Sequence, residues 1–86
     1  MPEISRFLGI VISMHYRDHA PPHFHARYGD QEATFSINDL ELMEGKLPKR
    51  VISYILEWAF EHRQELLGNW SLIESRKPLQ KIQPLV

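Results

Sequence analysis

The sequence contains no cysteine, which excludes disulfide bonds and thiolate chemistry. It also lacks a long apolar run: the longest, Leu8–Ile12, is far shorter than the roughly 20 residues that a membrane-spanning helix needs. Its N-terminus has no basic region followed by an apolar stretch, as a secretory signal peptide would. Because disulfide-free proteins of this kind are typical of a reducing compartment, we expect a cytoplasmic protein with no membrane partner.

A strong excess of charge is absent as well. Ten lysines and arginines against eleven acidic residues give a formal net charge of −1, so the chain as a whole is no non-specific binder of nucleic acid. Its 86 residues, 43% of them hydrophobic and 24% charged, predict one globular domain over residues 1–86. Histidine is what stands out: four of the five histidines lie between His15 and His25.

The N-terminal half alternates between apolar and polar residues, which is typical of half-buried strands. One strand is predicted over Leu8–Tyr16, and Pro21-Pro22 end it because proline cannot donate to a sheet ladder. Gly29-Asp30 is a hairpin turn signal. The remaining predicted strands are His23–Tyr28, Glu32–Ile37 and a short fourth strand over Leu40–Glu44.

The C-terminal half changes to helical spacing. Pro48 suits the start of a helix, because its missing N–H has no helical partner to lose, and apolar residues then recur every three or four positions as far as Leu67. Gly68 is expected to stop or kink this helix, with a short helical turn over Asn69–Ile73 and an extended tail over Leu79–Val86. The predicted fold is therefore α+β: a three- to four-stranded antiparallel sheet with one long C-terminal helix packed on one face.

The predicted helix covers the apolar face of the sheet, so alternation decides where the histidines lie. In the second strand the apolar side chains point toward the helix and the others point away: Phe24, Ala26 and Tyr28 against His23, His25 and Arg27. His15 and Arg17 belong to the outward face of the first strand, and Asp18-His19 lies at the end of the same hairpin. These outward residues are expected to share one sheet surface.

Three interpretations fit this surface. The first is a solvated sheet face, since many antiparallel sheets leave one face wet. The second is a metal site, because two histidines separated by one residue on a strand point the same way, about 7 Å apart at Cα. The candidate ligands for a divalent ion such as Zn²⁺ are His23, His25 and either His19 or Asp18, although nothing outside the segment clearly completes a tetrahedral set.

The third interpretation is metal-free acid–base chemistry on a phosphodiester, or recognition of a phosphate group. Histidine titrates near neutral pH, so one ring can remove a proton while another donates one. Arg17 and Arg27 are candidates to hold the phosphate. Tyr16 and Tyr28 flank the histidine-rich segment and are candidates to stack on a base, but alternation places both on the apolar side of the sheet.

The segment Asp18–Gly29, which reads Asp-His-Ala-Pro-Pro-His-Phe-His-Ala-Arg-Tyr-Gly, resembles the signature of a small bacterial family known as domain of unknown function 4160. Further similarity extends over most of the chain, at Gly45–Pro48, Glu57–Ala59, His62-Arg63 and within Leu67–Leu85. His15 departs from the family pattern, which more often has an aromatic residue at this position.

The resemblance implies a small stand-alone protein that is often encoded beside another small domain, in a pair that resembles a toxin–antitoxin module. By that analogy this chain is the toxin-like member, and its partner is a small antitoxin-like protein. The positions that match the family's signature, and so carry the implied activity, are Asp18, His19, His23 and His25.

We therefore expect a toxin-like component of a bacterial two-gene module, acting on RNA or a nucleotide through the histidine face as a ribonuclease or related phosphodiester-processing enzyme. Its candidate catalytic residues are Asp18, His19, His23 and His25, and its candidate substrate-binding residues are Arg17 and Arg27. The alternatives are a small metal-binding domain, or a non-enzymatic module whose sheet edge or C-terminal tail binds a partner protein or a second copy of the chain as a homodimer.

Overall fold

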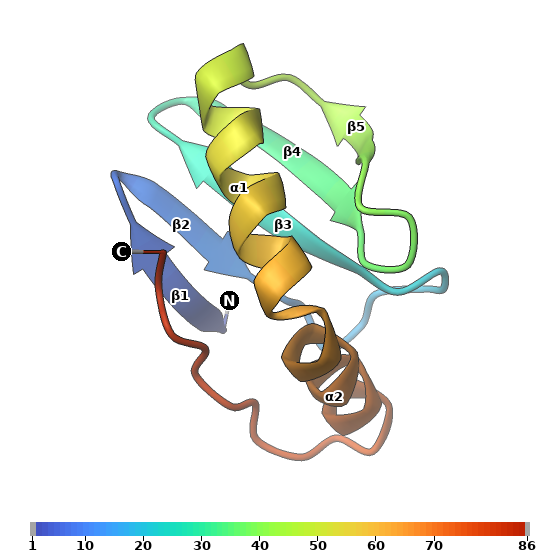
Figure 1. The fold of residues 1–86 in the computed structure, drawn as a ribbon. Coiled ribbons are helices and arrows are strands. Elements are labelled where there is room, and N and C mark those ends of the chain that lie inside the picture. Colours follow the sequence, from blue (N-terminus) through green and yellow to red (C-terminus); the bar gives the residue numbers. More distant parts are fainter. Residues whose placement is uncertain (1, 86) are drawn as a thin grey trace.

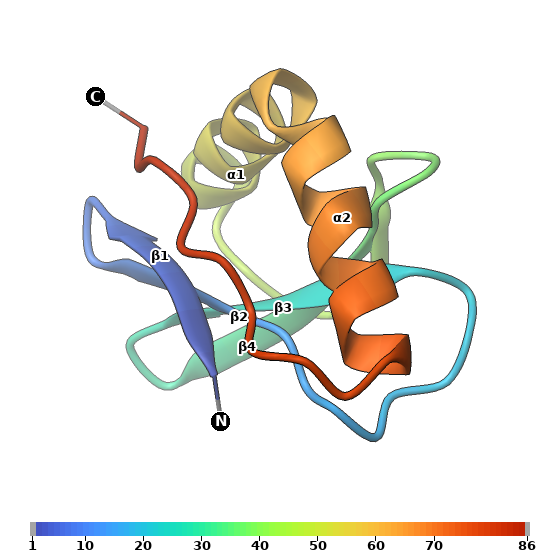
Figure 2. The same cartoon turned by 90° about the horizontal axis from the view of Figure 1, so that it is seen from below.

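Five antiparallel strands precede two helices in the computed structural model, which describes residues 2–85 (Figure 1). Neighbouring strands pair in chain order, so the sheet is a simple meander. Helices α1 (Lys49–Glu61) and α2 (Arg63–Glu74) both lie on one face of the sheet (Figures 1 and 2). The strands are β1 (Glu3–Phe7), β2 (Ile10–Ser13), β3 (His23–Tyr28), β4 (Gln31–Ser36) and β5 (Leu42–Gly45). The predicted α+β class with an antiparallel sheet is confirmed, while the number of strands and the course of the helix differ from the prediction.

Alternation in β3 follows the prediction, since Phe24 and Ala26 are buried beneath the helices whereas His23 and His25 are only partly buried. The strands on either side also bury their apolar residues on the helical side: Ile10 and Ile12 of β2, and Ala33 and Phe35 of β4. Polar side chains of these middle strands, such as His25, Arg27 and Thr34, therefore lie on the open face of the sheet. His23 lies at the end of this face, where its ring centroid is 5.3 Å from that of Trp70 in α2.

Trp58 of α1 lies at the centre of the core and is fully buried. The centroid of its ring system is 5.4 Å from that of Phe7 and 5.8 Å from that of Phe24. Its indole N–H donates a hydrogen bond of 2.8 Å to the carbonyl oxygen of Gln83. One side chain therefore connects the sheet, the first helix and the C-terminal tail.

The predicted strand over Leu8–Tyr16 is wrong in its extent. A hairpin at Leu8-Gly9 joins β1 to β2, and these two residues have positive φ angles of 51° and 77°. Such angles belong to a two-residue type I′ turn, which asparagine and glycine favour. Because leucine is no turn signal and its neighbours are apolar, the alternation appears continuous through the turn, and the prediction omits β1.

The predicted long helix is broken at a different place. Its first part ends at Glu61, and a second helix begins at Arg63, with His62 between them at φ −114° and ψ 21°. Gly68, the predicted stop, lies inside α2. A three-and-four spacing of apolar residues does not distinguish one straight helix from two that turn to stay on the same sheet. The short turn predicted over Asn69–Ile73 is therefore part of a full second helix.

The C-terminal tail is extended, as predicted, and runs back from α2 to β1 (Figure 2). The side-chain amide of Asn69 makes two hydrogen bonds of 2.9 Å with the backbone of Gln80. The N–H of Ile82 donates to the carbonyl oxygen of Ile4 at 2.8 Å. These bonds hold the tail against both the helices and the first strand. Within residues 2–85, no helix is both long enough and apolar enough to cross a membrane.

Two glycine substitutions should have opposite effects on stability. Gly68→Ala replaces a helical glycine that faces open space, so we expect the free energy of unfolding to rise by about 0.5–1 kcal/mol. Gly45→Ala should lower it by more than that amount, because Gly45 has a φ of +93° and a Cβ there would lie 2.3 Å from the carbonyl oxygen of Glu32. Urea denaturation of both variants measures the changes, and a loss of stability in Gly68→Ala would contradict the placement of this residue inside α2.

Candidate functional site

The strand register organises the open face of the sheet around His25. The row that crosses the sheet through this residue consists of the cross-strand partners Glu3, Ser13, His25, Thr34 and Glu44. The next row consists of Arg6, Val11, Arg27 and Glu32. Because His25 stands in the middle strand of its row, it is the residue toward which the other polar groups of the face can converge.

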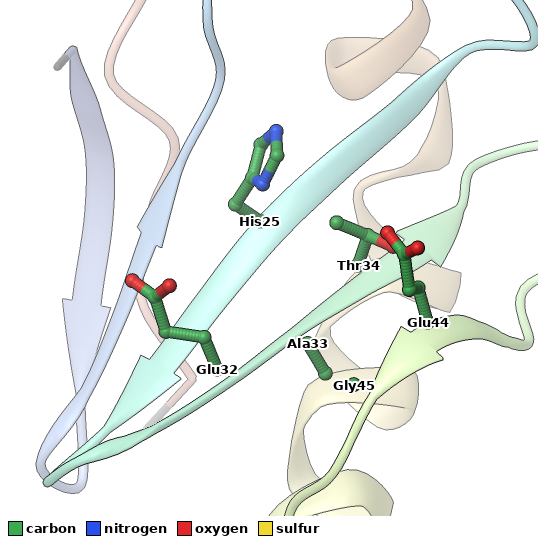
Figure 3. Close-up of a pocket in the computed structure, with 6 residues that line it drawn as sticks. All are labelled: His25, Glu32, Ala33, Thr34, Glu44 and Gly45. Atoms are coloured by element: carbon green, nitrogen blue, oxygen red, sulfur yellow. The ribbon is translucent and has the colours of Figure 1, made fainter.

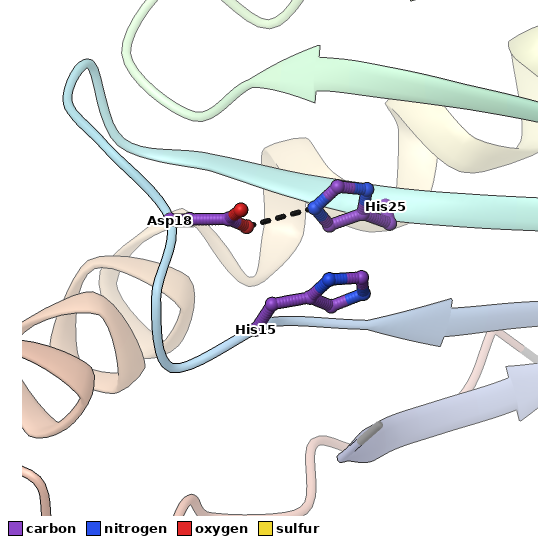
Figure 4. Close-up of side chains that lie close together, drawn as sticks. All are labelled: His15, Asp18 and His25. Atoms are coloured by element: carbon purple, nitrogen blue, oxygen red, sulfur yellow. Dashed lines mark hydrogen bonds and ion pairs between the residues drawn. The ribbon is translucent and has the colours of Figure 1, made fainter.

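The carboxylate of Asp18 reaches this face from the loop that follows β2 (Figure 4). Its Oδ2 atom lies 2.8 Å from Nε2 of His25 and 3.2 Å from Nε2 of His23. Two imidazoles therefore share one carboxylate oxygen. The Nε2–H of His25 donates to Asp18, and a neutral His25 then keeps the lone pair of its Nδ1 atom.

His23 has a second, different partner. Its Nδ1 atom lies 2.8 Å from the carbonyl oxygen of Pro21, and because a carbonyl can only accept, Nδ1 must carry a hydrogen. The Nε2 atom of His23 faces the carboxylate of Asp18 at 3.2 Å, and this contact is an ion pair only when the ring is protonated. The two histidines of β3 therefore have different hydrogen-bonding roles around one acid.

His15 also belongs to this group, although it is not one of the predicted catalytic residues. Its ring stacks on the ring of His25, with centroids 3.9 Å apart and planes at 13° (Figure 4). Its Nε2 atom is buried and has no hydrogen-bond partner among residues 2–85. Burial, and next the neighbouring His25, lower the pKa of His15 below its ordinary value of 6.5.

We call His15, Asp18, His23 and His25 the histidine cluster. Three of its members were predicted to share a surface as candidate catalytic residues, and the structure places them in contact. His19, the remaining candidate, is exposed and makes no hydrogen bond to the cluster within the described residues. It lies at the rim, where it lines the hollows on both sides of Asp18.

Arg17 and Arg27 lie on opposite sides of the cluster. Arg27 lines a shallow hollow with His15 and His25, and its cross-strand partner is Glu32. Arg17 lines a different hollow, formed by the loop after β2 and the end of α2. The structure therefore separates the two candidate phosphate-binding residues into two subsites.

Two carboxylates, which the sequence did not single out, border the cluster on the other flank. Glu32 and Glu44 line a hollow of about 270 Å³ together with His25 and Thr34 (Figure 3). Alternation and pairing could have placed both residues on this face, had the register between β4 and β5 been known. The open face is therefore acidic over β4 and β5, beside His25.

Both tyrosines near the cluster are more exposed than predicted. Tyr16 and Tyr28 are 39% and 38% exposed, so neither belongs to the buried core, although Tyr28 remains on the same face of β3 as Phe24 and Ala26. Tyr16 lies in the loop beyond β2, where period-two alternation no longer applies. Tyr28 is the last residue of β3, beyond the cover of the helices.

The metal-ligand set that comes together differs from the one expected. His15, Asp18 and His25 each place one ligand atom within 4.8 Å of the other two, and His19 is not among them. The lone pairs of imidazole nitrogens lie in the ring plane, so the parallel rings of His15 and His25 direct them side by side instead of toward one point. One ring would have to turn before both could bind the same ion, and the arrangement suits proton exchange better.

A family model described as "Domain of unknown function (DUF4160)" matches residues 9–71. The matched segment is more than half of the chain and includes the whole histidine cluster, while β1 and the C-terminal tail lie outside it. No match was found among curated proteins or among solved structures.

The stability of the protein should depend on pH through His15. Because the pKa of folded His15 is lowered, the unfolded chain binds more protons at acidic pH; the contribution of this residue is complete above about pH 6.5 and is lost as the pH falls below it. His15→Phe keeps a stacking ring without a titrating nitrogen. Urea denaturation at about pH 7.5 and about pH 5.5 should show a smaller loss of stability in the variant than in the parent protein. An equal loss in both would contradict this assignment.

Proposed function

Since this chain belongs to the family described as "Domain of unknown function (DUF4160)", we propose a function from its site: a toxin-like ribonuclease that cleaves RNA by metal-independent acid–base chemistry. The observation that carries the proposal is a single carboxylate oxygen of Asp18 that lies 2.8 Å from Nε2 of His25 and 3.2 Å from Nε2 of His23, while the ring of His25 is stacked on that of His15. Neutral imidazole rings have ring nitrogens that carry no proton. Such a nitrogen can accept a proton from a substrate, which acid–base catalysis requires.

The reaction needs no group that the chain does not supply. The 2′-hydroxyl of a ribose attacks the adjacent phosphorus while a base removes its proton, and an acid protonates the departing 5′-oxygen. The P–O5′ bond breaks, which leaves a 2′,3′-cyclic phosphate and a free 5′-hydroxyl. Each proton taken by the base is matched by one given by the acid, so the enzyme needs one neutral and one protonated imidazole at the start.

His25 and His23 fit these two roles. Neutral His25 donates to Asp18 and keeps a free lone pair, so it is the general base, and Asp18 stabilises the imidazolium that forms. His23 is the proposed general acid: its Nδ1–H donates to the carbonyl of Pro21, and its Nε2 atom, which lies 3.2 Å from Asp18, would deliver the proton to the leaving oxygen. His15 is a positioning residue: its neutral ring orients His25 and adds no competing charge.

The charges around the cluster favour one path for the RNA. Glu32 and Glu44 repel phosphates from the surface over β4 and β5, whereas Arg27 and Arg17 stand on either side of the cluster away from Glu44. Arg27 lies two residues along β3 from His25, on the same face, where a guanidinium can stabilise the charge that develops on the phosphate. The bound RNA would therefore run from Arg27 past the histidine cluster toward Arg17.

Cleavage of a single-stranded RNA should proceed in the presence of EDTA and yield 2′,3′-cyclic phosphate ends. His25→Ala and Asp18→Asn should each lower the rate about 100-fold or more, because each removes or misorients the general base. His62→Gln is the matched control, since His62 lies at the junction of the helices and bonds to Glu65 instead of Asp18. Gel analysis of end-labelled RNA, with melting temperatures of all variants, measures the effect.

Each other outcome of this experiment contradicts the proposal. Activity that EDTA abolishes and Zn²⁺ restores would replace it with a metal-dependent mechanism on His15, Asp18 and His25. Cleavage that survives His25→Ala in a folded protein would remove the histidine cluster from the reaction. No cleavage at all would favour a non-enzymatic binding module.

Production of the protein in a bacterial host should slow growth, as expected of a toxin-like component whose partner, a small antitoxin-like protein, is missing. His23→Ala and His25→Ala should relieve the defect if they remain folded, because both act on the same reaction. Growth curves with protein levels checked by immunoblot measure the effect. Normal growth with the parent protein would contradict the toxin-like role.

A further inference from the structure

A second hollow, of about 500 Å³, lies next to the histidine cluster and is not part of it. It is lined by Tyr16, Arg17, Asp18, His19 and Arg76, and so joins the loop after β2 to the turn that ends α2. Asp18 belongs to both places, because its carboxylate is bonded to the histidine cluster while the residue borders the hollow. Whatever binds in the hollow therefore lies directly beside the proposed reaction.

Two guanidiniums face this hollow without a protein counter-ion. Arg17 and Arg76 are exposed, and within residues 2–85 neither lies within 4.0 Å of a carboxylate oxygen. The acid that borders the hollow, Asp18, directs its Oδ2 atom to the histidine cluster, where it lies 2.8 Å from Nε2 of His25 and 3.2 Å from Nε2 of His23. Two unpaired planar cations beside one hollow are suited to bind a phosphate, for which arginine has the matching donor geometry.

The backbone at Arg76 is unusual for this residue type. Arg76 follows the C-cap of α2 with a φ of +57°, and its N–H donates to the carbonyl of Ile73 while the N–H of Lys77 donates to that of Leu72. This is a Schellman ending, in which glycine is usual because other residues are strained at that position. A strained cationic residue in place of glycine points to a role for the side chain.

Tyr16 completes the hollow with a held aromatic ring. Its hydroxyl donates a hydrogen bond of 2.6 Å to the carbonyl oxygen of Lys77, the residue next to Arg76. The same turn therefore positions both the ring of Tyr16 and the backbone that carries Arg76. The ring is partly exposed, so a base can stack on it without the cost of ordering the side chain.

We infer that this hollow is a nucleotide subsite for single-stranded RNA, in which Arg17 and Arg76 bind one phosphate and Tyr16 stacks on the neighbouring base. The inference rests on the proposed function for the identity of the strand, and it deepens it by naming the unit that is bound outside the reacting phosphodiester. Arg17 alone would be a single arginine in the loop after β2, and Arg76 supplies the second guanidinium of the phosphate site.

The test measures binding of a short 2′-O-methyl RNA, which cannot be cleaved because it lacks the attacking hydroxyl. Fluorescence anisotropy gives Kd for the full-length parent protein and its variants at several salt concentrations. Arg76→Gly and Arg17→Ala should each weaken binding about tenfold and lower the salt dependence by about one ion. Tyr16→Leu should also weaken binding about tenfold through loss of stacking.

Arg76→Gly separates the charge from the fold. Glycine relieves the strain at a φ of +57°, so the melting temperature should stay the same or rise while binding falls. Arg50→Ala, which removes an exposed arginine near the start of α1, is the matched control for net charge and should change Kd less than twofold. Unchanged binding by Arg76→Gly and Arg17→Ala, or an equal loss in Arg50→Ala, would overturn the subsite.

The outcomes for the subsite and for the proposed ribonuclease can be told apart. Binding that depends on Arg17, Arg76 and Tyr16 without any cleavage of ordinary RNA would support the subsite and contradict the proposed reaction. Cleavage that needs His25 while all these variants bind and cleave normally would support the reaction and overturn the subsite.

Discussion

Burial of one sheet face beneath α1, α2 and the tail is the constraint on which the rest of the structure depends. Trp58 and the apolar residues around it occupy that face, so Phe24 and Ala26 must point toward the helices. Side chains alternate along a strand, and His23 and His25 are therefore held on the opposite face. A register slip of one residue would bury both imidazoles, which the core cannot accept without partners for their nitrogens.

The proposed chemistry of the open face depends on the carboxylate of Asp18, a residue that belongs to no strand of the sheet. Asp18 lies on the loop after β2, and its carboxylate accepts a hydrogen bond from His25 and faces His23, while the ring of His15 stacks on that of His25. Similar side chains therefore have different surroundings, which is the physical basis of the proposed acid–base roles. The charges outside the cluster are also asymmetric, with the carboxylates of Glu32 and Glu44 over β4 and β5, and with the guanidiniums of Arg17 and Arg76 between the loop after β2 and the end of α2.

Sequence analysis predicted best the elements in which apolar and polar residues alternate regularly and whose ends are marked by turn residues. β3 is bounded by two prolines and a Gly-Asp turn, and both its limits and its two faces were predicted correctly. β1 was missed because a leucine occupies a turn position where glycine or asparagine is usual. The break between the helices was predicted at Gly68 but lies at His62. The spacing of apolar residues shows which face of a helix is buried, but it does not show where the helix bends.

The sequence by itself determined that His25 and Arg27 would lie on the open face of a sheet, because alternation acts over neighbouring residues. Only the tertiary structure decided which side chains touch. His15 entered the cluster, and His19 stayed at its rim, because the loop after β2 folds back over the sheet in a way that no period describes. Arg76 lies far along the chain from Arg17, and the two border one hollow only because α2 ends beside that loop.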